Sequence, residues 1–179
     1  VYKRQVSYVL DKLHYDPKII NDDFSINVYE DFVDAVDSQK RFLLKSDIKS
    51  FSQYRLSIDD QIKSSDITFF NLVYETLKTR MSEVESFYEE VLFTPFNFDV
   101  NEQIDLDYEN QEYADGMDEL KSLWRKRLKL SVLDGFASKK EINIEDEKIK
   151  SDSDIEKESR KSINDNLRDF FQFNSELER

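Results

Sequence analysis

The sequence contains very few of the residues that make sharp turns. Its 179 residues include two glycines and two prolines, against average usage of roughly 7% and 5%. Hairpins and glycine-rich phosphate loops need backbone positions with φ > 0, which glycine adopts at the lowest cost. A sequence poor in glycine and rich in Glu, Lys and Asp is tolerated best by helices. We therefore expect an all-α fold, and we exclude a β-sandwich, a Rossmann domain and a P-loop domain.

Cysteine is absent and histidine occurs once. These counts exclude thiol nucleophiles, disulfides and zinc sites built from His and Cys. Carboxylates, hydroxyls, lysine and arginine are the side chains left for chemistry. We expect no cofactor, and the lack of cysteine suits an oxidising compartment.

Basic residues are outnumbered, since 26 Lys and Arg stand against 39 Asp and Glu, which gives a net charge of −13. This charge repels phosphate backbones and anionic lipid surfaces, so we expect neither nucleic acid nor a membrane as a partner. No apolar run reaches the length of a membrane span. Because the chain begins at Val1 without Met, we expect it to be part of a longer protein.

Apolar residues that recur every three or four positions predict six helices. The predicted segments are approximately 2–14, 22–37, 48–62, 66–93, 117–135 and 163–171. The segment 66–93 is the clearest, and its apolar stripe consists of Phe70, Val73, Leu77, Met81, Val84, Tyr88 and Val91. We expect Ser46 to cap the third helix and Gly135 to lie near the end of the fifth. The expected architecture is an irregular helical bundle of about five to six helices within a single domain, 1–179.

Two strongly charged segments interrupt this pattern. Residues 97–118 contain eight acidic residues and no Lys or Arg, which predicts a long acidic loop. Phe98, Val100, Ile104 and Leu106 alternate with polar residues within it, so we expect the loop to wrap the bundle with its apolar side facing inward. Residues 139–161 are dominated by charge, which predicts either an exposed, flexible insertion or a solvated helix.

Ser46 and Lys49 have the spacing of a Ser/Lys acyl enzyme, in which an unprotonated lysine activates a serine one helical turn away. Asp47 lies between them and would keep the lysine protonated. Ser46 also stands where a helix cap is needed. We therefore interpret Ser46 as a capping residue and not as a nucleophile.

The acidic loop begins like a calcium-binding loop, with Asp105, Asp107 and Glu109 at alternate positions. A calcium loop of this kind needs Gly at its sixth position and Glu at its twelfth, where this chain has Asn110 and Gly116. The pattern therefore does not predict a specific metal site. Thirty-nine acidic residues always supply some pair of carboxylates, so glycosidase chemistry is neither predicted nor excluded.

His14 and Trp124 complete the candidates. His14 lies near Asp11 and Asp16 at a predicted helix end, where packing or the helix dipole explains it better than general-base catalysis. Trp124 lies in a basic run that is typical of nucleic-acid contact, but it shares the stripe of Leu120 and Leu128. We expect Trp124 to face the core and its basic neighbours to pair with the preceding acidic stretch. No catalytic, cofactor-binding or metal-binding residue is predicted.

Several segments, in order along the chain, resemble the N-terminal helical domain of the tail-specific proteases, also called C-terminal processing peptidases. The segments are Phe42–Ile48 followed by Phe51, Tyr54 and Arg55, then Pro95–Phe98, and then Asp118–Leu128, with Ser175 where that family approaches its next domain. The last of the three blocks, with its Leu-Trp pair, is the most specific. The family commonly has a Trp where this chain has Tyr113–Asp115, and the segment 139–161 is longer than the family pattern.

The resemblance implies a parent serine endopeptidase of the periplasm or cell envelope, with a PDZ domain and a Ser/Lys dyad downstream of this chain. Ser46 and Lys49 do not correspond to that dyad. The implied partners are the PDZ and protease domains of the same parent chain, protein substrates and an adaptor protein. The expected function is a non-catalytic domain that helps to enclose or dock substrates. The alternative is a free-standing helical interaction module that pairs through the stripe from Phe70 to Val91.

Overall fold

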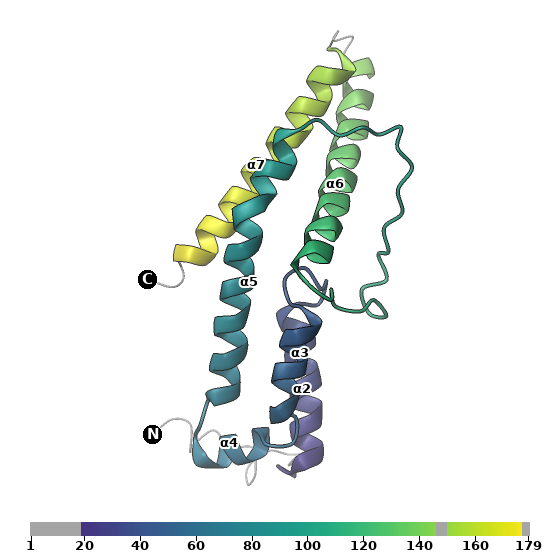
Figure 1. Ribbon diagram of the computed structural model, residues 1–179. Coiled ribbons are helices and arrows are strands. Elements are labelled where there is room, and N and C mark those ends of the chain that lie inside the picture. The colour runs from purple at the N-terminus through teal and green to yellow at the C-terminus, as the bar shows by residue number, and fades with distance from the viewer. Residues whose placement is uncertain (1–18, 146–149, 177–179) are drawn as a thin grey trace. The chain divides into compact units, whose positions relative to one another are not determined.

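The computed structural model describes residues 19–145 and 150–176 (Figure 1). Over these residues the chain forms six α-helices, one short 3-10 helix and no β-strand, so the expected all-α fold is confirmed. The elements are α2 (Asp22–Val36), α3 (Lys45–Phe51), η2 (Ser52–Tyr54), α4 (Ile58–Ser64), α5 (Thr68–Phe93), α6 (Met117–Glu145) and α7 (Asp152–Glu176). The helix predicted over 2–14 lies outside the described residues.

The chain divides into two compact units. Unit 1 is formed by residues up to 80 together with 107–116, and unit 2 by 81–106 together with the residues from 117 onward. The helix α5 contributes its N-terminal half, up to Arg80, to unit 1 and its remainder to unit 2.

Aromatic packing around Phe69 forms the centre of unit 1. This ring lies 5.6 Å from Tyr29 and 5.7 Å from Phe32 of α2, measured between ring centroids. Phe51 of α3 and Tyr54 of η2 lie at 6.5 and 5.9 Å. Each such pair adds roughly 0.5–1.5 kcal/mol beyond the burial of its apolar area. The buried cluster thus joins α2, α3, η2 and α5, and the remaining members are Val33, Leu43, Ile58 and Val73.

The connector from α2 to α3 is organised by the carboxylate of Asp37. It accepts hydrogen bonds from three successive backbone N–H groups, those of Arg41, Phe42 and Leu43, at 2.7, 2.9 and 2.8 Å. Asp37 is 4% exposed. Lys40 adopts the left-handed conformation, with φ of 49°, so the turn is made without glycine. The carboxylate supplies the partners that these buried donors need.

The same connector holds residues 107–116, the part of the acidic loop that belongs to unit 1. The Lys40 ammonium donates to the backbone carbonyls of Tyr108 and Glu109. The Lys45 N–H donates to the Ala114 carbonyl at 2.9 Å, within an isolated parallel bridge between Leu44 and Ala114. Hydrogen bonds to backbone carbonyls therefore attach this segment, and the ion pairs of Lys45 with Glu112 and Asp115 supplement them.

The prediction that Ser46 caps a helix is wrong. The helix α3 begins at Lys45 with Leu44 at the capping position, and Ser46 is exposed within its first turn. The Asp47 carboxylate accepts the Leu44 N–H at 2.9 Å and also receives a two-bond ion pair from Arg80, each bond 2.9 Å long. Asp47 performs the capping one residue further along because Arg80 of α5 holds its carboxylate in place.

The single helix predicted over 48–62 is also wrong, because the chain forms α3, η2 and α4 there. A tertiary contact fixes the start of α4. The Ser25 hydroxyl of α2 donates to the Asp59 carboxylate and accepts the Asp59 N–H, both at 2.8 Å. The apolar spacing of Ile48, Phe51 and Ile58 continues across the break, so periodicity alone could not locate it.

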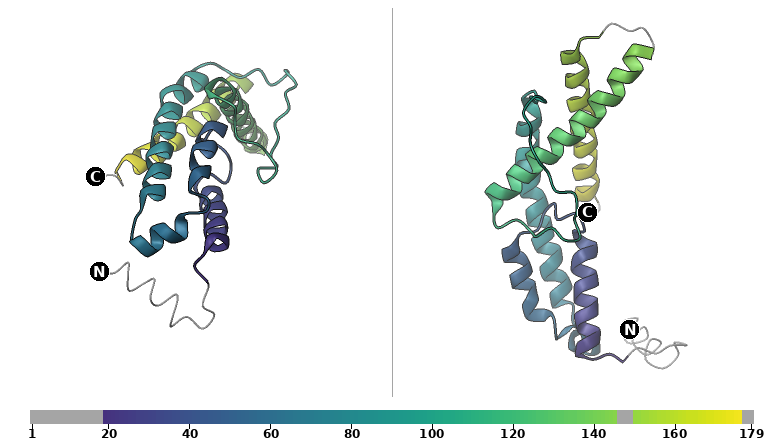
Figure 2. Two further views of the ribbon diagram at one scale, coloured as in Figure 1. Left: turned by 60° about the horizontal axis from the view of Figure 1, so that its bottom comes forward. Right: turned by 90° about the vertical axis from the view of Figure 1, so that its right-hand side faces the viewer.

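In unit 2, α7 runs back alongside α6 (Figures 1 and 2). The expected helix end at Gly135 is wrong, because α6 continues to Glu145. A Cβ atom added at Gly135 would lie 3.6 Å from the Cβ of Ser159, which is 1% exposed on α7. This glycine therefore marks a close approach of two helices. Residues 139–145 belong to α6 and residues 152–161 to α7.

We predict that Asp37→Ala lowers the free energy of unfolding by about 3 kcal/mol or more, because three N–H groups, two of them buried, lose a charged acceptor. Urea unfolding followed by circular dichroism measures the change. Asp31→Ala is the matched control, since Asp31 is exposed on α2, and it should cost less than about 0.5 kcal/mol. Equal losses in the two variants would contradict the role given to Asp37.

We predict that Gly135→Ala stabilises the chain by about 0.5–1 kcal/mol, because alanine favours a helix interior and its Cβ meets Ser159 at an ordinary contact distance. Gly135→Leu should instead destabilise it by about 1–3 kcal/mol, since the larger side chain must push α6 and α7 apart. Thermal unfolding of both variants tests the contact. A lower melting temperature for Gly135→Ala than for the wild type would contradict the predicted stabilisation.

Candidate functional site

The residues that the sequence singled out do not come together as a reactive site. Ser46 and Lys49 are both exposed on α3. Asp47, the residue between them, is buried and bound to Arg80. The serine hydroxyl therefore lies on an open helix face rather than in a hollow that could exclude water.

In the acidic loop, Asp107 accepts hydrogen bonds from the backbone and side-chain nitrogens of Asn110 at 3.4 and 2.8 Å. No group of three or more His, Asp or Glu side chains suited to a metal ion occurs within residues 19–145 and 150–176. His14 lies outside the described residues. Within the same described ranges, no helix combines the length and the apolar composition of a transmembrane span.

The expectation is confirmed for Trp124 and for two of its basic neighbours, Arg125 and Lys129. Trp124 is 2% exposed on α6. Arg125 forms an ion pair with Glu102 of the acidic stretch, and Lys129 does the same at 2.7 Å. The Lys129 ammonium also donates to the Val100 carbonyl at 2.9 Å. These contacts attach the first part of the loop to α6 within unit 2.

Burial of the loop's apolar residues is only partial. Phe98 packs on Phe136 of α6 with 5.4 Å between ring centroids, and Ile104 is half-buried. Val100 and Leu106, however, are 51% and 53% exposed. The alternation of apolar residues therefore does not produce a continuous inward-facing side. A hollow of about 480 Å³ lies where Glu102, Arg125 and Lys129 meet Val91 and Pro95.

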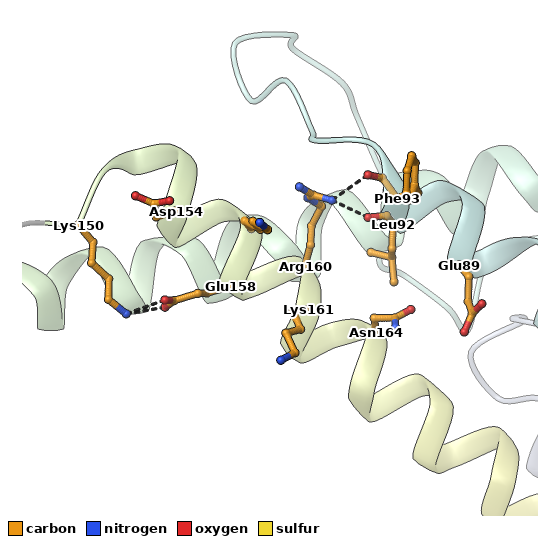
Figure 3. A pocket seen from close by; sticks show the side chains of 10 residues that line it. Glu89, Leu92, Phe93, Lys150, Asp154, Glu158, Arg160, Lys161 and Asn164 are labelled. Atoms are coloured by element: carbon orange, nitrogen blue, oxygen red, sulfur yellow. Dashed lines mark hydrogen bonds and ion pairs between the residues drawn. The ribbon is translucent and has the colours of Figure 1, made fainter.

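A second and larger hollow lies in unit 2 between the end of α5 and α7, and we call it the α5–α7 hollow (Figure 3). Its volume is about 910 Å³. It is lined by Glu89, Leu92 and Phe93 from α5, by Lys150, and by Asp154, Lys157, Glu158, Arg160, Lys161 and Asn164 from α7. Both apolar surface and cationic groups therefore face one space, which is an arrangement suited to binding.

Arg160 builds the wall of this hollow. Its guanidinium donates to the last carbonyls of α5, those of Leu92 and Phe93, at 2.7 and 3.1 Å (Figure 3). Glu156 accepts a bond of 2.7 Å from Arg160 and one of 3.0 Å from the Phe96 N–H beyond the helix end. The pair satisfies backbone groups that a helix terminus leaves open. The end of α5 is thereby fixed against α7.

One wall of the α5–α7 hollow presents an exposed aromatic ring on a backbone that Arg160 holds in place. The Phe93 side chain is 86% exposed, although the carbonyl of the same residue is held by Arg160. Tyr88 is buried one helical turn before Leu92 and stacks on Phe171 at 5.3 Å between ring centroids. Burial and the neighbouring Glu89 carboxylate raise the pKa of the Tyr88 hydroxyl, so Tyr88 stays neutral.

Sequence reasoning missed Glu156, Arg160 and the hollow that they build. It placed 139–161 outside the core because charge dominates there. The available signal was the spacing of four residues between Glu156 and Arg160, together with Ile155 and Ser159, which are each 1% exposed. What the sequence lacked was the position of the α5 carbonyls, which are the groups that Arg160 binds.

We predict that Glu102→Gln weakens the attachment of the loop to α6. Pairing with Arg125 and Lys129 lowers the pKa of Glu102 from 4.5 to about 2. A carboxylate whose pKa is lower in the folded chain than in the unfolded chain stabilises the fold. This stabilisation is present in full at pH values above the unfolded-state pKa, and it is lost as the pH falls towards the folded-state pKa of about 2. The difference in unfolding free energy between wild type and variant should therefore shrink as the pH falls from about 4.5 to about 2. Urea unfolding at several pH values measures it.

Glu109→Gln is the control for this prediction, since Glu109 is exposed in the same loop and should leave the unfolding free energy nearly unchanged at every pH. Carbon NMR of the Glu102 carboxyl provides a direct reading, with an expected midpoint of about 2. A midpoint above 4 would show that the two ion pairs do not form in solution.

Comparison with known proteins gives concordant matches to one family. The family model "Tail specific protease N-terminal domain" matches residues 6–176. The chain is 23% identical over 125 residues to a tail-specific protease of Haemophilus influenzae, a match that covers 69% of this chain and 18% of that protein. The chain thus spans less than a fifth of the length of this curated relative. Because the family model matches nearly the whole sequence, the chain belongs to the tail-specific protease N-terminal domain family.

Proposed function

We propose that this chain is a non-catalytic helical domain of a periplasmic tail-specific serine endopeptidase, and that it helps to enclose and dock protein substrates. Its other partners on this proposal are the PDZ and protease domains of the same parent chain and an adaptor protein. The family membership of residues 6–176 carries the proposal. The reactive serine and lysine belong to the downstream protease domain, as the family resemblance implies.

The division of roles between buried acidic side chains and exposed apolar side chains supports a binding role. The buried acids Asp37, Asp47 and Glu156 all accept backbone N–H groups, so they are committed to holding the fold. Apolar side chains remain exposed in unit 2, namely Phe93, Ile142 and Phe173 at 86%, 56% and 60%. Apolar groups presented on a rigid helical frame are suited to contact with unfolded or partner protein.

The alternative function, a free-standing module that pairs through the stripe of α5, is disfavoured by burial. Val73, Val84 and Tyr88 of that stripe are 1%, 0% and 2% exposed. A second helix could reach them only after the fold had opened. The middle of the stripe therefore belongs to the interior of the chain, whereas Phe70 at its start is 50% exposed.

The test uses the intact parent protease and compares a protein substrate with a short peptide that contains the same cleavage site. We predict that replacing Phe93, Ile142 and Phe173 together with serine raises KM for the protein substrate about 3–10-fold, because docking contacts are lost. The kcat value and peptide hydrolysis should not change, since the protease domain is untouched.

The matched control replaces Lys49, Asn71 and Glu75, three exposed polar residues, with serine, and it should leave KM unaltered. An unchanged KM in the apolar variant would overturn the docking role. Equal losses for the protein substrate and the peptide would also overturn it, because they would show that the domain only supports the fold of the protease.

A further inference from the structure

We propose that the α5–α7 hollow binds acidic protein segments that carry a bulky apolar side chain. In this arrangement Lys157 and Lys161 pair with carboxylates of the segment, and Phe93 contacts its apolar side chain. The inference rests on the proposed docking role and assigns it a site and a class of ligand.

The charge of the hollow differs from that of the chain. Its lining carries four cationic and three anionic side chains, and Glu156 lies 2.7 Å from Arg160, which gives 4 − 4 = 0, whereas the whole chain carries −13. At physiological ionic strength, charges more than about 8 Å away are largely screened. A ligand seated in the hollow therefore responds mainly to the lining residues, and the acidic remainder of the surface opposes it much less.

Lys157 and Lys161 are the cations that remain available. Lys150 is bound to Glu158 at 2.7 Å, and Arg160 is bound to the carbonyls of Leu92 and Phe93 (Figure 3). Arg160 is also bound to Glu156. Lys157 and Lys161 are exposed and form no ion pair with any carboxylate of the described residues. Spaced by four along α7, they share a helix face with roughly 5–6 Å between Cβ atoms. Two unneutralised like charges this close favour an anionic ligand.

The carboxylates of the lining are not positioned to replace such a ligand. Asp154 accepts the Ser151 hydroxyl at 2.6 Å in the first turn of α7. Glu89 accepts the Tyr88 hydroxyl at 3.4 Å on α5. Each has a hydrogen-bond donor of its own, whereas neither lysine has a carboxylate acceptor. Both carboxylates keep their charge, so an acidic segment gains from direct contact with Lys157 and Lys161 and not from the net charge of the hollow.

Phe93 adds the apolar component. Its ring is 86% exposed, while Arg160 fixes its backbone, so the ring is presented on a rigid support. Ordering a partner against a fixed ring costs less conformational entropy than ordering it against a mobile one. Contact between a partner's aromatic or aliphatic side chain and this ring buries apolar area on both sides.

The experiment measures fluorescence anisotropy of labelled 12-residue peptides with the 179-residue chain at 0.15 M salt. Both peptide ends are blocked, so that a terminal carboxylate cannot contribute. One peptide carries several Glu around a central Phe. A second has Gln in place of every Glu, and a third has Ala in place of Phe. We expect the first peptide to bind about tenfold more tightly than either of the others.

Variants locate the binding. Lys157→Glu and Lys161→Glu should each weaken binding of the first peptide about 3–10-fold, as expected for reversal of a surface charge next to a carboxylate. Lys49→Glu makes the same charge change on exposed α3 and should have no effect.

Phe93→Ser should weaken binding of the first peptide but not of the Ala peptide, whereas Leu56→Ser, which alters an exposed apolar side chain that has no place in the proposed docking surface, should change neither. All replaced side chains are exposed, and circular dichroism verifies that each variant folds.

Equal binding of the Glu and Gln peptides would overturn the proposal, and so would equal effects of Lys157→Glu and Lys49→Glu, or the absence of any binding. Self-association of the free chain that Phe93→Ser abolishes would also overturn it, because the occupant would then be a second copy. Each of these results leaves the docking role intact if the apolar variants of the parent protease still raise KM. Unchanged KM together with peptide binding at Lys157 and Lys161 would refute the docking role alone.

Discussion

The hydrogen bonds of Asp37 organise the segment on which the rest of unit 1 depends. By accepting three successive N–H groups, this carboxylate folds the connector that carries Lys40 and Lys45. Those two residues hold the second part of the acidic loop through its backbone carbonyls. The connector also leads directly into α3, where Asp47 binds Arg80 of α5. One buried carboxylate thus organises the connector that binds residues 107–116 and leads from α2 into α3.

The chain uses carboxylates where many proteins use glycine and proline. With two residues of each kind, it makes its turns at Lys40 and Ser65, which are non-glycine residues with positive φ. Backbone groups at turns and helix ends are satisfied by Asp37, by Asp47 and, beyond α5, by Glu156. A buried ionised acid is costly unless it is hydrogen-bonded or paired, and these acids meet that condition. The acidic composition is therefore partly structural and not only a solvated surface.

Sequence reasoning succeeded where a signal is local and repeated. The long stripe of α5, the burial of Trp124 and the pairing of its basic neighbours with Glu102 all follow from spacing and charge. It failed at Ser46 and Gly135, where the usual signals for a helix start and a helix end were overridden by tertiary contacts with Arg80 and Ser159. The α5–α7 hollow was inaccessible for the same reason, since Arg160 acts on carbonyls that lie 67 and 68 residues away in the chain.

A function for such a domain has to be argued from the side chains that the fold does not use. In the hollow, Arg160 and Glu156 are consumed in fixing the end of α5, and their neighbours Lys157, Lys161 and Phe93 remain open to solvent. A surface remote from the scissile bond contributes equally to substrate and transition state, so it acts on KM and not on the chemical step. A docking domain of a protease can therefore vary its surface charges to select segments without altering the catalytic residues. On the proposed docking role, the contrast between a chain of −13 and a hollow that presents Lys157 and Lys161 without carboxylate partners would direct acidic segments to the hollow and away from the rest of the surface.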